Sequence, residues 1–236
     1  MLNNNLSSNK PQRLNKFVAL CLGMSRRQAD ELIEQGKIIV NNQSAKLGQQ
    51  ITNGDKITYN NKPLSIKDYQ LILLNKPVGY VCSRAAQGNT PTIYKLLPKA
   101  FAHLKPVGRL DKDSSGLILL TNNGDLAHRL THPSFHKIKR YIVTINLPLQ
   151  PLHRQMISDF GVQLTDGHSK LTRQYEGDDR RWIVTMSEGR NRQIRRTFTA
   201  LGYTVTKLHR TNFGNYSLDD LKRGEWREIT NTEKLL

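Results

Sequence analysis

Two carboxylates, Asp111 and Asp113, lie in a short polar loop that is bracketed by Gly108 and Gly116. The loop leads directly into the aliphatic run 117–120, which is typical of a buried strand because it follows a turn signal. Catalytic groups often occupy loops that a rigid scaffold positions. This loop is therefore the first candidate for a functional site.

One chemistry that the loop could support is calcium binding. The spacing of Asp111, Asp113, Ser115 and Gly116 matches the first half of an EF-hand loop. The twelfth position of that pattern requires a bidentate Glu and a following helix, whereas here it is Asn122 at the end of an aliphatic strand. We reject this interpretation and expect no metal.

Two further chemistries use the carboxylates without calcium. A phosphoryl-transfer pair needs an apolar strand before its first Asp, but the segment 107–110 is a poor strand, and the adjacent Arg109 leaves little reason to recruit Mg²⁺. Alternatively, Asp111 is a lone carboxylate that a neighbouring arginine keeps ionised and that acts as a nucleophile or base. From the loop alone, this catalytic role and a purely structural role of Asp111 in capping the turn remain equally open.

The charge of the whole chain indicates a polyanionic partner. The 236 residues contain 36 Lys and Arg against 19 Asp and Glu, which gives a net charge of +17. Such an excess suits phosphate neutralisation, and nucleic acid is favoured over a membrane because no basic amphipathic helix with bulky apolar anchors is present. No apolar run approaches the roughly 20 residues of a membrane span.

Other bulk features indicate a cytoplasmic protein. Residues 1–11 are rich in Asn and Ser, do not resemble a secretory signal, and are expected to form a disordered tail. The two cysteines, Cys21 and Cys82, lie far apart, and no Cys/His spacing suits zinc. A reducing compartment fits this cysteine usage best.

Residues 12–59 read as a small separate domain. Apolar residues from Leu14 to Cys21 recur at helical spacing, and Ser25 with Gln28 forms a capping box that opens a second helix, which Gly36 ends. Alternating strands with turns at Asn41-Asn42 and Gly54-Asp55 follow.

Four basic residues mark one region of this small domain. Arg13 and Lys16 lie off the apolar stripe of the first helix, and no acidic residue is interspersed before Asp30. A solvated charged face would normally be the simpler interpretation, but this one-sided charge favours phosphate contact. The residues expected to bind RNA are Arg13, Lys16, Arg26 and Arg27. In its order of helix, helix and hairpin, the segment RLNKFVALCLGMSRRQADELIEQGKIIVNN resembles the S4 RNA-binding domain.

A polar linker at residues 60–68 separates this module from a larger domain at residues 69–236. Short strands are expected at 71–74, 117–120, 141–145, 182–186, 204–208 and 225–229. A few short helices lie between them in no regular βαβ order, including one that Asn123 caps and one at 191–201. The pattern predicts an α+β domain with a mainly antiparallel mixed sheet flanked by helices.

The expected helix at 191–201 divides into two faces. Its apolar residues cluster on one side, Arg192 and Arg196 fall opposite, and Arg195 lies on the flank. No Glu lies at i,i+4 to pair with these arginines, as a solvated face would normally show. Together with Arg190, Lys207 and Arg210, these residues predict an anion-binding patch around the helix and the following strand.

Five motifs in order resemble the RsuA-type pseudouridine synthases across the whole chain. These are NKPVGY, GRLDKDSSGLILLTNNGD, KRYIV, SEGRNRQIRR and the LGYTV run that ends in L.R. The resemblance implies isomerisation of uridine to pseudouridine in RNA without cofactor or metal. It implies that Asp111 is the catalytic aspartate, Tyr141 the active-site tyrosine and Arg195 the basic residue that pairs with Asp111. Arg109 is expected to help hold the flipped nucleotide, and Arg190, Arg192 and Arg196 to bind substrate.

The expected partner is ribosomal RNA or a pre-ribosomal particle, and the expected state is a monomer. The sequences of the motifs GRLDKDS, EGRNRQIRR and GEWREIT resemble those of family members that act on large-subunit (23S) rRNA more than that of the small-subunit enzyme. The alternatives are the same reaction on small-subunit (16S) rRNA and a non-catalytic RNA-binding or ribosome-assembly factor.

Overall fold

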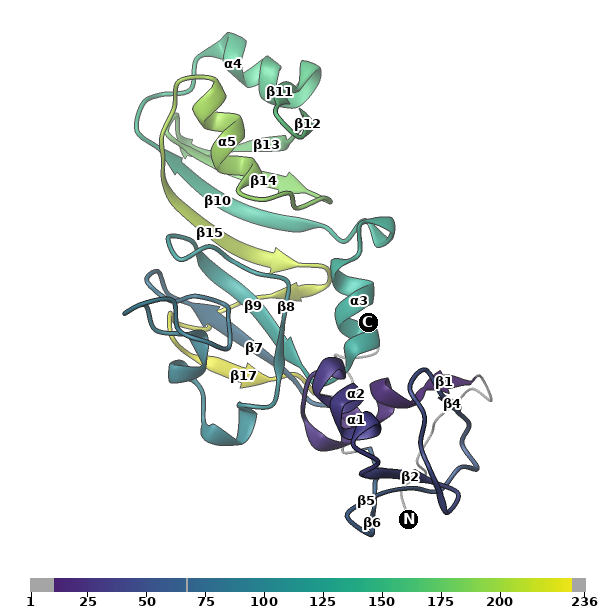
Figure 1. Ribbon diagram of the computed structural model, residues 1–236. Helices are drawn as coiled ribbons and strands as arrows, with labels where there is room; N and C mark the ends of the chain where they lie inside the picture. The colour runs from purple at the N-terminus through teal and green to yellow at the C-terminus, as the bar shows by residue number, and fades with distance from the viewer. Residues whose placement is uncertain (1–10, 67, 231–236) are drawn as a thin grey trace. The chain divides into compact units, whose positions relative to one another are not determined.

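The computed structural model describes residues 11–66 and 68–230 (Figure 1). The chain divides into two compact units, with the boundary between Tyr69 and Gln70. Each unit has a hydrophobic core of its own.

The small unit contains two helices and two small sheets. Its elements are β1 (Gln12–Arg13), α1 (Leu14–Leu22), α2 (Arg26–Glu34), β2 (Ile38–Val40), β3 (Gln43–Ser44), β4 (Gln50–Ile51), β5 (Ile57–Tyr59) and β6 (Lys62–Pro63). Four strands pair in the order β3-β2-β5-β6, and β1 pairs with β4. The helices bury their apolar stripes against these strands, so a core forms within about 50 residues.

Local sequence signals of the small unit are confirmed. The Ser25 side chain accepts a hydrogen bond from the backbone N–H of Gln28, and the Gln28 side chain accepts one from the backbone N–H of Ser25, which completes the capping box. Asn41 and Asn42 both have positive φ, as a two-residue hairpin turn between β2 and β3 requires.

The segment at 60–68, which we expected to be a linker, is partly structured. Lys62–Pro63 forms β6 and pairs with β5. Leu64 and Ile66 pack against the core of the small unit. The small unit therefore extends past Tyr59. The sequence does not predict this extension, because a strand of only two residues after a turn is too short to give an alternating apolar pattern.

The large unit is built on one long sheet. Its strands are β7 (Leu71–Lys76), β8 (Lys105–Val107), β9 (Ser115–Thr121), β10 (Lys139–Ile145), β13 (Thr172–Asp178), β14 (Arg181–Met186), β15 (Val205–Phe213), β16 (Tyr216–Ser217) and β17 (Trp226–Glu228). Its helical elements are η1 (Ile93–Leu96), η2 (Lys99–Phe101), α3 (Gly124–Thr131), η3 (Pro133–Phe135), α4 (Pro151–Gln155), η4 (Met156–Phe160) and α5 (Gln193–Ala200). A separate hairpin pairs β11 (Val162–Leu164) with β12 (Gly167–Ser169).

The sheet order is β13-β14-β10-β15-β9-β7-β17, with β8 paired to β9 and β16 to β15. All of these pairs are antiparallel except β15 with β9. The prediction of an α+β domain with a mainly antiparallel mixed sheet and flanking helices is confirmed. The single parallel pair joins the two halves of the sheet at its centre (Figure 1).

Strands β7 and β9 are buried on both faces of the sheet. In β9, Ile118 and Leu120 belong to the larger core, whereas Leu117 and Leu119 belong to the smaller one. Helix α5 packs on the larger core and α3 on the smaller one. The all-aliphatic run that we expected to be a strand is therefore apolar at every position because both of its faces are covered.

Gly116 allows the parallel pair to form. Its φ is +111°, and a Cβ atom at this position would lie 2.2 Å from the carbonyl oxygen of Arg210 on β15. The obstacle is backbone rather than a movable side chain. Any other residue at Gly116 would therefore push β9 and β15 apart.

Candidate active site

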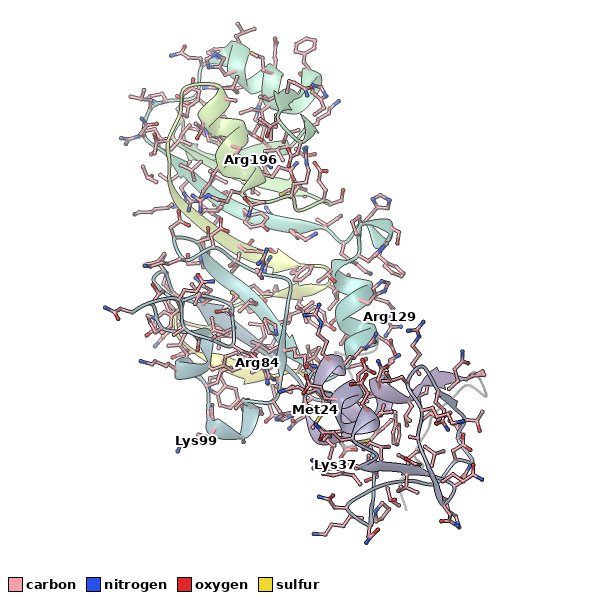
Figure 2. All side chains as sticks on the ribbon, viewed as in Figure 1. Met24, Lys37, Arg84, Lys99, Arg129 and Arg196 are labelled. Carbon is pink, nitrogen blue, oxygen red and sulfur yellow. The ribbon has the colours of Figure 1, made fainter. Side chains whose placement is uncertain are left out.

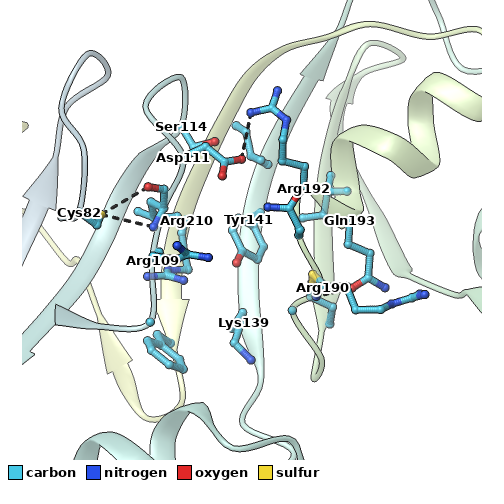
Figure 3. A pocket seen from close by; sticks show the side chains of 18 of the residues that line it. Cys82, Arg109, Asp111, Ser114, Lys139, Tyr141, Arg190, Arg192, Gln193 and Arg210 are labelled. Carbon is cyan, nitrogen blue, oxygen red and sulfur yellow. Dashed lines mark hydrogen bonds and ion pairs between the residues drawn. The ribbon is translucent and has the colours of Figure 1, made fainter. Parts of the chain in front are cut away.

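A cavity of about 870 Å³ lies in the large unit between the Asp111 loop and the loop that precedes α5 (Figure 3). Asp111, Tyr141, Arg109, Arg190 and Arg192 all line it. Residues far apart in the sequence therefore meet in one pocket, as the five-motif pattern implies.

The Asp111 loop is a tight turn between β8 and β9. The backbone N–H of Ser114 donates to the carbonyl of Asp111 at 3.1 Å, which closes the turn. The carbonyl of Lys112 accepts a bond of 2.7 Å from the N–H of Gly79. Ser114 is 1% exposed, so the turn is anchored at its inner end while the Asp111 side chain stays one-third exposed.

Lys76 holds this turn from below, and sequence reasoning missed it. Its side chain is fully buried, and its ammonium donates to the carbonyls of Pro77 (3.0 Å), Asp111 (3.0 Å) and Ser114 (2.6 Å). Burial lowers the pKa of Lys76, and the nearby Cys82, Asp111 and Asp113 oppose that change. Lys76 lies within the NKPVGY motif, from which the sequence predicts no role for this lysine.

Cys82 fixes the residue before Asp111. The N–H of Leu110 donates to the Cys82 sulfur, and the thiol donates to the Leu110 carbonyl, each at 3.4 Å. Burial raises the pKa of the Cys82 thiol, so this group stays protonated at neutral pH. The thiol thus fixes both backbone polar groups of Leu110.

The arginine that contacts Asp111 is Arg192 and not Arg195. An Nη1 atom of Arg192 lies 3.3 Å from Asp111 Oδ2, and the same guanidinium donates to both carboxylate oxygens of Asp113 at 3.0 Å. Asp113 is thereby tied to the same arginine as Asp111. Hydrogen bonding to Arg192, with the charge of Arg195, lowers the pKa of Asp113.

Arg195 lies beside the same turn but holds its backbone. It donates to the carbonyls of Asp113 (2.9 Å) and Val205 (2.8 Å) and to the hydroxyl of Ser114 (3.3 Å). Its ion pair is with the Asp113 carboxylate at 3.5 Å, and its side chain is only 11% exposed. The predicted pairing of Arg195 with Asp111 is therefore replaced by a link from α5 to the segment just after Asp111.

Arg190 lines the pocket, whereas Arg196 is not among the lining residues, and both arginines are paired with carboxylates. Arg196 donates to both oxygens of Asp166, at 2.9 and 2.7 Å. Arg190 contacts Asp166 at 3.1 Å and Glu188 at 3.3 Å. The expected patch of unpaired arginines is thus partly neutralised by acids from outside the helix.

The floor of the pocket is formed by β10 and β15. Tyr141 and Arg210 are direct partners in the antiparallel register, as are Lys139 and Phe213, and all four line the cavity. Tyr141 is 8% exposed and belongs to the edge of the larger core. Arg109 also lines the cavity and is exposed.

Comparison with known proteins identifies this unit. Residues 70–200 match the RNA pseudouridylate synthase family, and residues 12–57 match the S4 domain. The chain belongs to the RNA pseudouridylate synthase family. It is therefore an isomerase, with an S4 domain ahead of the synthase domain, and the alternative of a non-catalytic factor is set aside.

Relatives of the synthase match most of its length. It is 38% identical over 226 residues to the dual-specificity RNA pseudouridine synthase RluF of Salmonella typhi. The aligned region covers 94% of this chain and 76% of that relative. It is 38% identical to the ribosomal small subunit pseudouridine synthase A of Haemophilus influenzae, with 94% and 97% covered. A crystal structure of a pseudouridylate synthase superposes with a TM-score of 0.68 at 37% identity and covers 94% of this chain and 97% of that one.

The basic residues expected in the S4 domain lie at the starts of its two helices. Arg13 is the N-cap residue of α1, and Arg26 and Arg27 open α2; all three are exposed. Lys16 is half-buried on α1. The amide of Asn15 holds Asp30, the first acid in the chain, at 2.9 Å.

Within residues 11–66 and 68–230, no helix is long and apolar enough to span a membrane. The same residues contain no group of three or more His, Cys, Asp or Glu side chains placed to hold a metal ion. In particular, the two carboxylates of the loop face the guanidinium of Arg192.

Proposed function

We propose that this synthase converts a uridine of ribosomal RNA to pseudouridine, with Asp111 as the catalytic carboxylate. The observation that carries this proposal is that Asp111 and Tyr141 line one pocket of a chain from this family. The substrate class is supported by the names of two relatives, one a ribosomal small subunit synthase and one a dual-specificity RNA synthase. A net charge of +17 suits a large polyanion such as rRNA.

The reaction moves the ribose from N1 to C5 of uracil. The C1′–N1 bond breaks and its electron pair leaves with the base as an anion. The carboxylate of Asp111 either bonds to C1′ or removes the C2′ proton to give a glycal. The base then turns and C5 bonds to C1′; in the first route the bond from Asp111 to C1′ breaks in this step, and in the glycal route C2′ takes back its proton from Asp111. The C5 proton is then lost and N1 is protonated. The backbone carbonyl of Asp111 accepts from both Lys76 and Ser114, and Cys82 fixes the backbone of the preceding Leu110.

The other site residues have roles that follow from their contacts. Tyr141 stacks on the uracil from the sheet floor, where its ring is held at the edge of the core. Arg195 positions the turn after Asp111 through the Asp113 carbonyl. Arg109 is exposed on the wall and contacts the flipped nucleotide, whose removal from its stack costs a few kcal/mol.

Substrate contacts at the mouth of the pocket depend on exchange of ion pairs. Arg190, Arg192 and Arg196 bind carboxylates in partly exposed pairs. Such pairs contribute only about 0–1 kcal/mol, so an RNA phosphate can take the place of the carboxylate.

In the S4 domain, Arg13, Lys16, Arg26 and Arg27 bind the RNA backbone. Cations in the first turn of a helix are unfavourable for its dipole, which makes Arg26 and Arg27 poor choices for stability and good ones for a phosphate ligand.

Large-subunit rRNA is the proposed substrate, because the sequences of the motifs GRLDKDS, EGRNRQIRR and GEWREIT resemble those of family members that act on it. The test is to incubate the full chain with unmodified 16S and 23S rRNA transcripts and to map pseudouridine in each. We expect one uridine, in the 23S transcript, to be converted, and modification of only 16S rRNA would move the assignment to the small subunit.

The catalytic role of Asp111 is tested by Asp111→Asn in the same assay. The amide keeps the shape of the side chain but supplies no nucleophile or base, so we expect turnover to fall by at least ~10³-fold with RNA affinity retained. The matched control is Asp113→Asn, which removes a carboxylate from the same turn. Turnover that survives in Asp111→Asn would contradict the assignment of this residue.

A further inference from the structure

Arg210 is a buried cation in the floor of the active-site pocket, and the proposed reaction has not yet used it. It lies on β15, is 3% exposed, and lines the cavity. Because it pairs directly with Tyr141 on the antiparallel strand β10, the two side chains project side by side from one face of the sheet. Figure 3 shows Arg210 and Tyr141 close together below Asp111.

The guanidinium of Arg210 is held at one end only. Its Nε donates to the carbonyl of Leu117 at 2.7 Å, and its Cζ lies 4.9 Å from the centroid of the Phe213 ring. The Nη2 atom is buried and has no hydrogen-bond partner among the described residues. Arg210 also forms no ion pair with any carboxylate in that part of the chain. An arginine does not lose its proton in a protein, so a buried positive charge remains uncompensated.

A second cation lies next to Arg210 and is already saturated. The Lys139 ammonium lies 5.4 Å from the centroid of the same Phe213 ring. It donates to the carbonyls of Lys137 (3.0 Å), Ser187 (3.0 Å) and Glu188 (3.4 Å). Burial, and then the charge of Arg210, lowers the pKa of Lys139. The floor thus carries two neighbouring positive charges, of which Arg210 alone has an unused donor.

A purely structural role explains only part of this arrangement. The bond from Nε to Leu117 links β15 to β9, but it uses one of five N–H donors. Leaving a buried donor unpaired is unfavourable for the folded protein. Such a cost is expected where the missing partner is a ligand that arrives in the pocket.

We propose that Arg210 contacts the target base, and that its guanidinium donates to a carbonyl oxygen of the uracil and stabilises the negative charge that the base acquires when the C1′–N1 bond breaks. This inference rests on the proposed function, because it assigns the recognition of the departing base within the same pocket. No proton is transferred by Arg210: it acts as a fixed donor aimed at developing charge, as in an oxyanion hole.

The position of Arg210 favours the base over a backbone phosphate. A stacked uracil on Tyr141 would place its edge against the next side chain of the same row, which is Arg210. RNA phosphates remain outside with the ribose chain, where the exposed Arg109 meets them. Phe213 and the bond to Leu117 fix the guanidinium in advance, so no reorganisation is needed during the reaction.

The test separates the chemical step from RNA binding in Arg210→Gln and Arg210→Lys. Single-turnover pseudouridine formation is measured on the rRNA transcript that the wild-type chain modifies, and RNA affinity by filter binding over a range of KCl concentrations. We expect Arg210→Gln to lower the rate constant of the bound complex by ~100-fold or more, as loss of one oxyanion donor does. Arg210→Lys retains the positive charge but lacks the planar guanidinium, so its rate constant should lie between those of the wild-type chain and Arg210→Gln.

RNA affinity and its salt dependence are expected to stay unchanged in both variants. A lost phosphate contact would lower the slope of log K against log salt by about 0.7–0.9. The matched control is Arg140→Gln, which removes an exposed charge from the neighbouring position of β10, outside the residues that line the pocket. This variant should keep the wild-type rate.

Three outcomes would overturn the proposal. A reduced salt slope with an unchanged rate of the bound complex would assign Arg210 to a phosphate. An unchanged rate in Arg210→Lys would show that no directed donor is needed, which holds even if Arg210→Gln fails to fold. A wild-type chain that modifies neither rRNA transcript would contradict the proposed function itself, and this inference with it.

Discussion

The cations around the active-site pocket fall into two groups that are held in opposite ways. At the mouth, Arg190, Arg192 and Arg196 bind carboxylates and stay partly exposed. In the interior, Lys76 and Lys139 bind backbone carbonyls, and Arg210 binds one carbonyl and a ring. Figure 2 shows Arg196 on helix α5.

This difference separates exchangeable contacts from fixed ones. A carboxylate partner neutralises an arginine, and a phosphate can replace it at little cost because both sites are near water. A carbonyl partner does not neutralise a cation, so the interior keeps its positive charge for the reacting groups. The mouth therefore suits RNA binding and the interior suits chemistry.

The largest effect on stability is expected from Lys76→Met. The change leaves the carbonyls of Asp111 and Ser114 buried without their donor, which should cost about 2–4 kcal/mol in the free energy of unfolding and misplace Asp111. Urea denaturation and turnover measure the two effects. Lys112→Met is the control, because the exposed side chain of this lysine in the same turn donates to the Thr90 hydroxyl and to no backbone carbonyl among the described residues. Equal losses of stability and turnover in Lys76→Met and Lys112→Met would show that the interior cation contributes no more than the exposed one.

A smaller effect is expected where the two groups meet, at Arg195 and Arg192. Arg195→Ala removes a side chain that is 11% exposed and holds two carbonyls, and should cost about 1–3 kcal/mol together with a large part of turnover. Arg192→Ala removes a side chain that is 43% exposed and should cost less than ~1 kcal/mol. If Arg192→Ala abolishes turnover while Arg195→Ala retains it, the direct contact to Asp111 is the catalytic one.

Acid should loosen the turn through Asp113. Hydrogen bonding to Arg192 lowers the pKa of this carboxyl in the folded protein, so its contribution to stability is complete above its ordinary value of about 4 and is lost as the pH falls through the lowered value. The wild-type chain should therefore lose stability relative to Asp113→Asn below about pH 4. Denaturation curves at neutral and acid pH check this, and parallel curves for the two proteins would exclude such a role.

The smallest effect is expected for Arg196→Ala. Its pair with Asp166 is partly exposed on both sides, so the free energy of unfolding should change by about 0–1 kcal/mol. RNA affinity should fall more than stability, because the arginine binds phosphate once Asp166 releases it. A change in stability with no change in filter-binding affinity would make this arginine structural.

Sequence reasoning was most reliable where the signal is local. The capping box at Ser25, the cap at Asn123 and the doubly buried strand β9 depend on residues that are neighbours in the chain. The pocket residues Asp111 and Tyr141 came from motifs and lie in one cavity.

The pairing of the arginines could not be read in the same way. The helical wheel started at Asn191, but Arg192 has φ +48° and precedes α5, so its side chain leaves the helix axis in another direction and reaches Asp111. Asp166, which pairs with Arg196, lies 30 positions away, where no i,i+4 rule applies. Lys76 was missed because the apolar pattern stops at Leu74, whereas the strand continues to Lys76.

The parallel contact between β9 and β15 has a consequence for how the protein folds. Ser115 and His209 are joined by a hydrogen bond although they are 94 positions apart in the chain, and Gly116 must meet the Arg210 backbone for the pair to form. Contacts of this range close slowly, because the chain entropy of the intervening loop is lost before the pairing is gained. The hairpin of β8 and β9 can form early, but Arg210 joins Tyr141 and Asp111 only after the C-terminal third has been made. Such a chain gains its reactive pocket in the last stages of folding, so a nascent or truncated chain that already exposes Asp111 has no floor on which to hold a base.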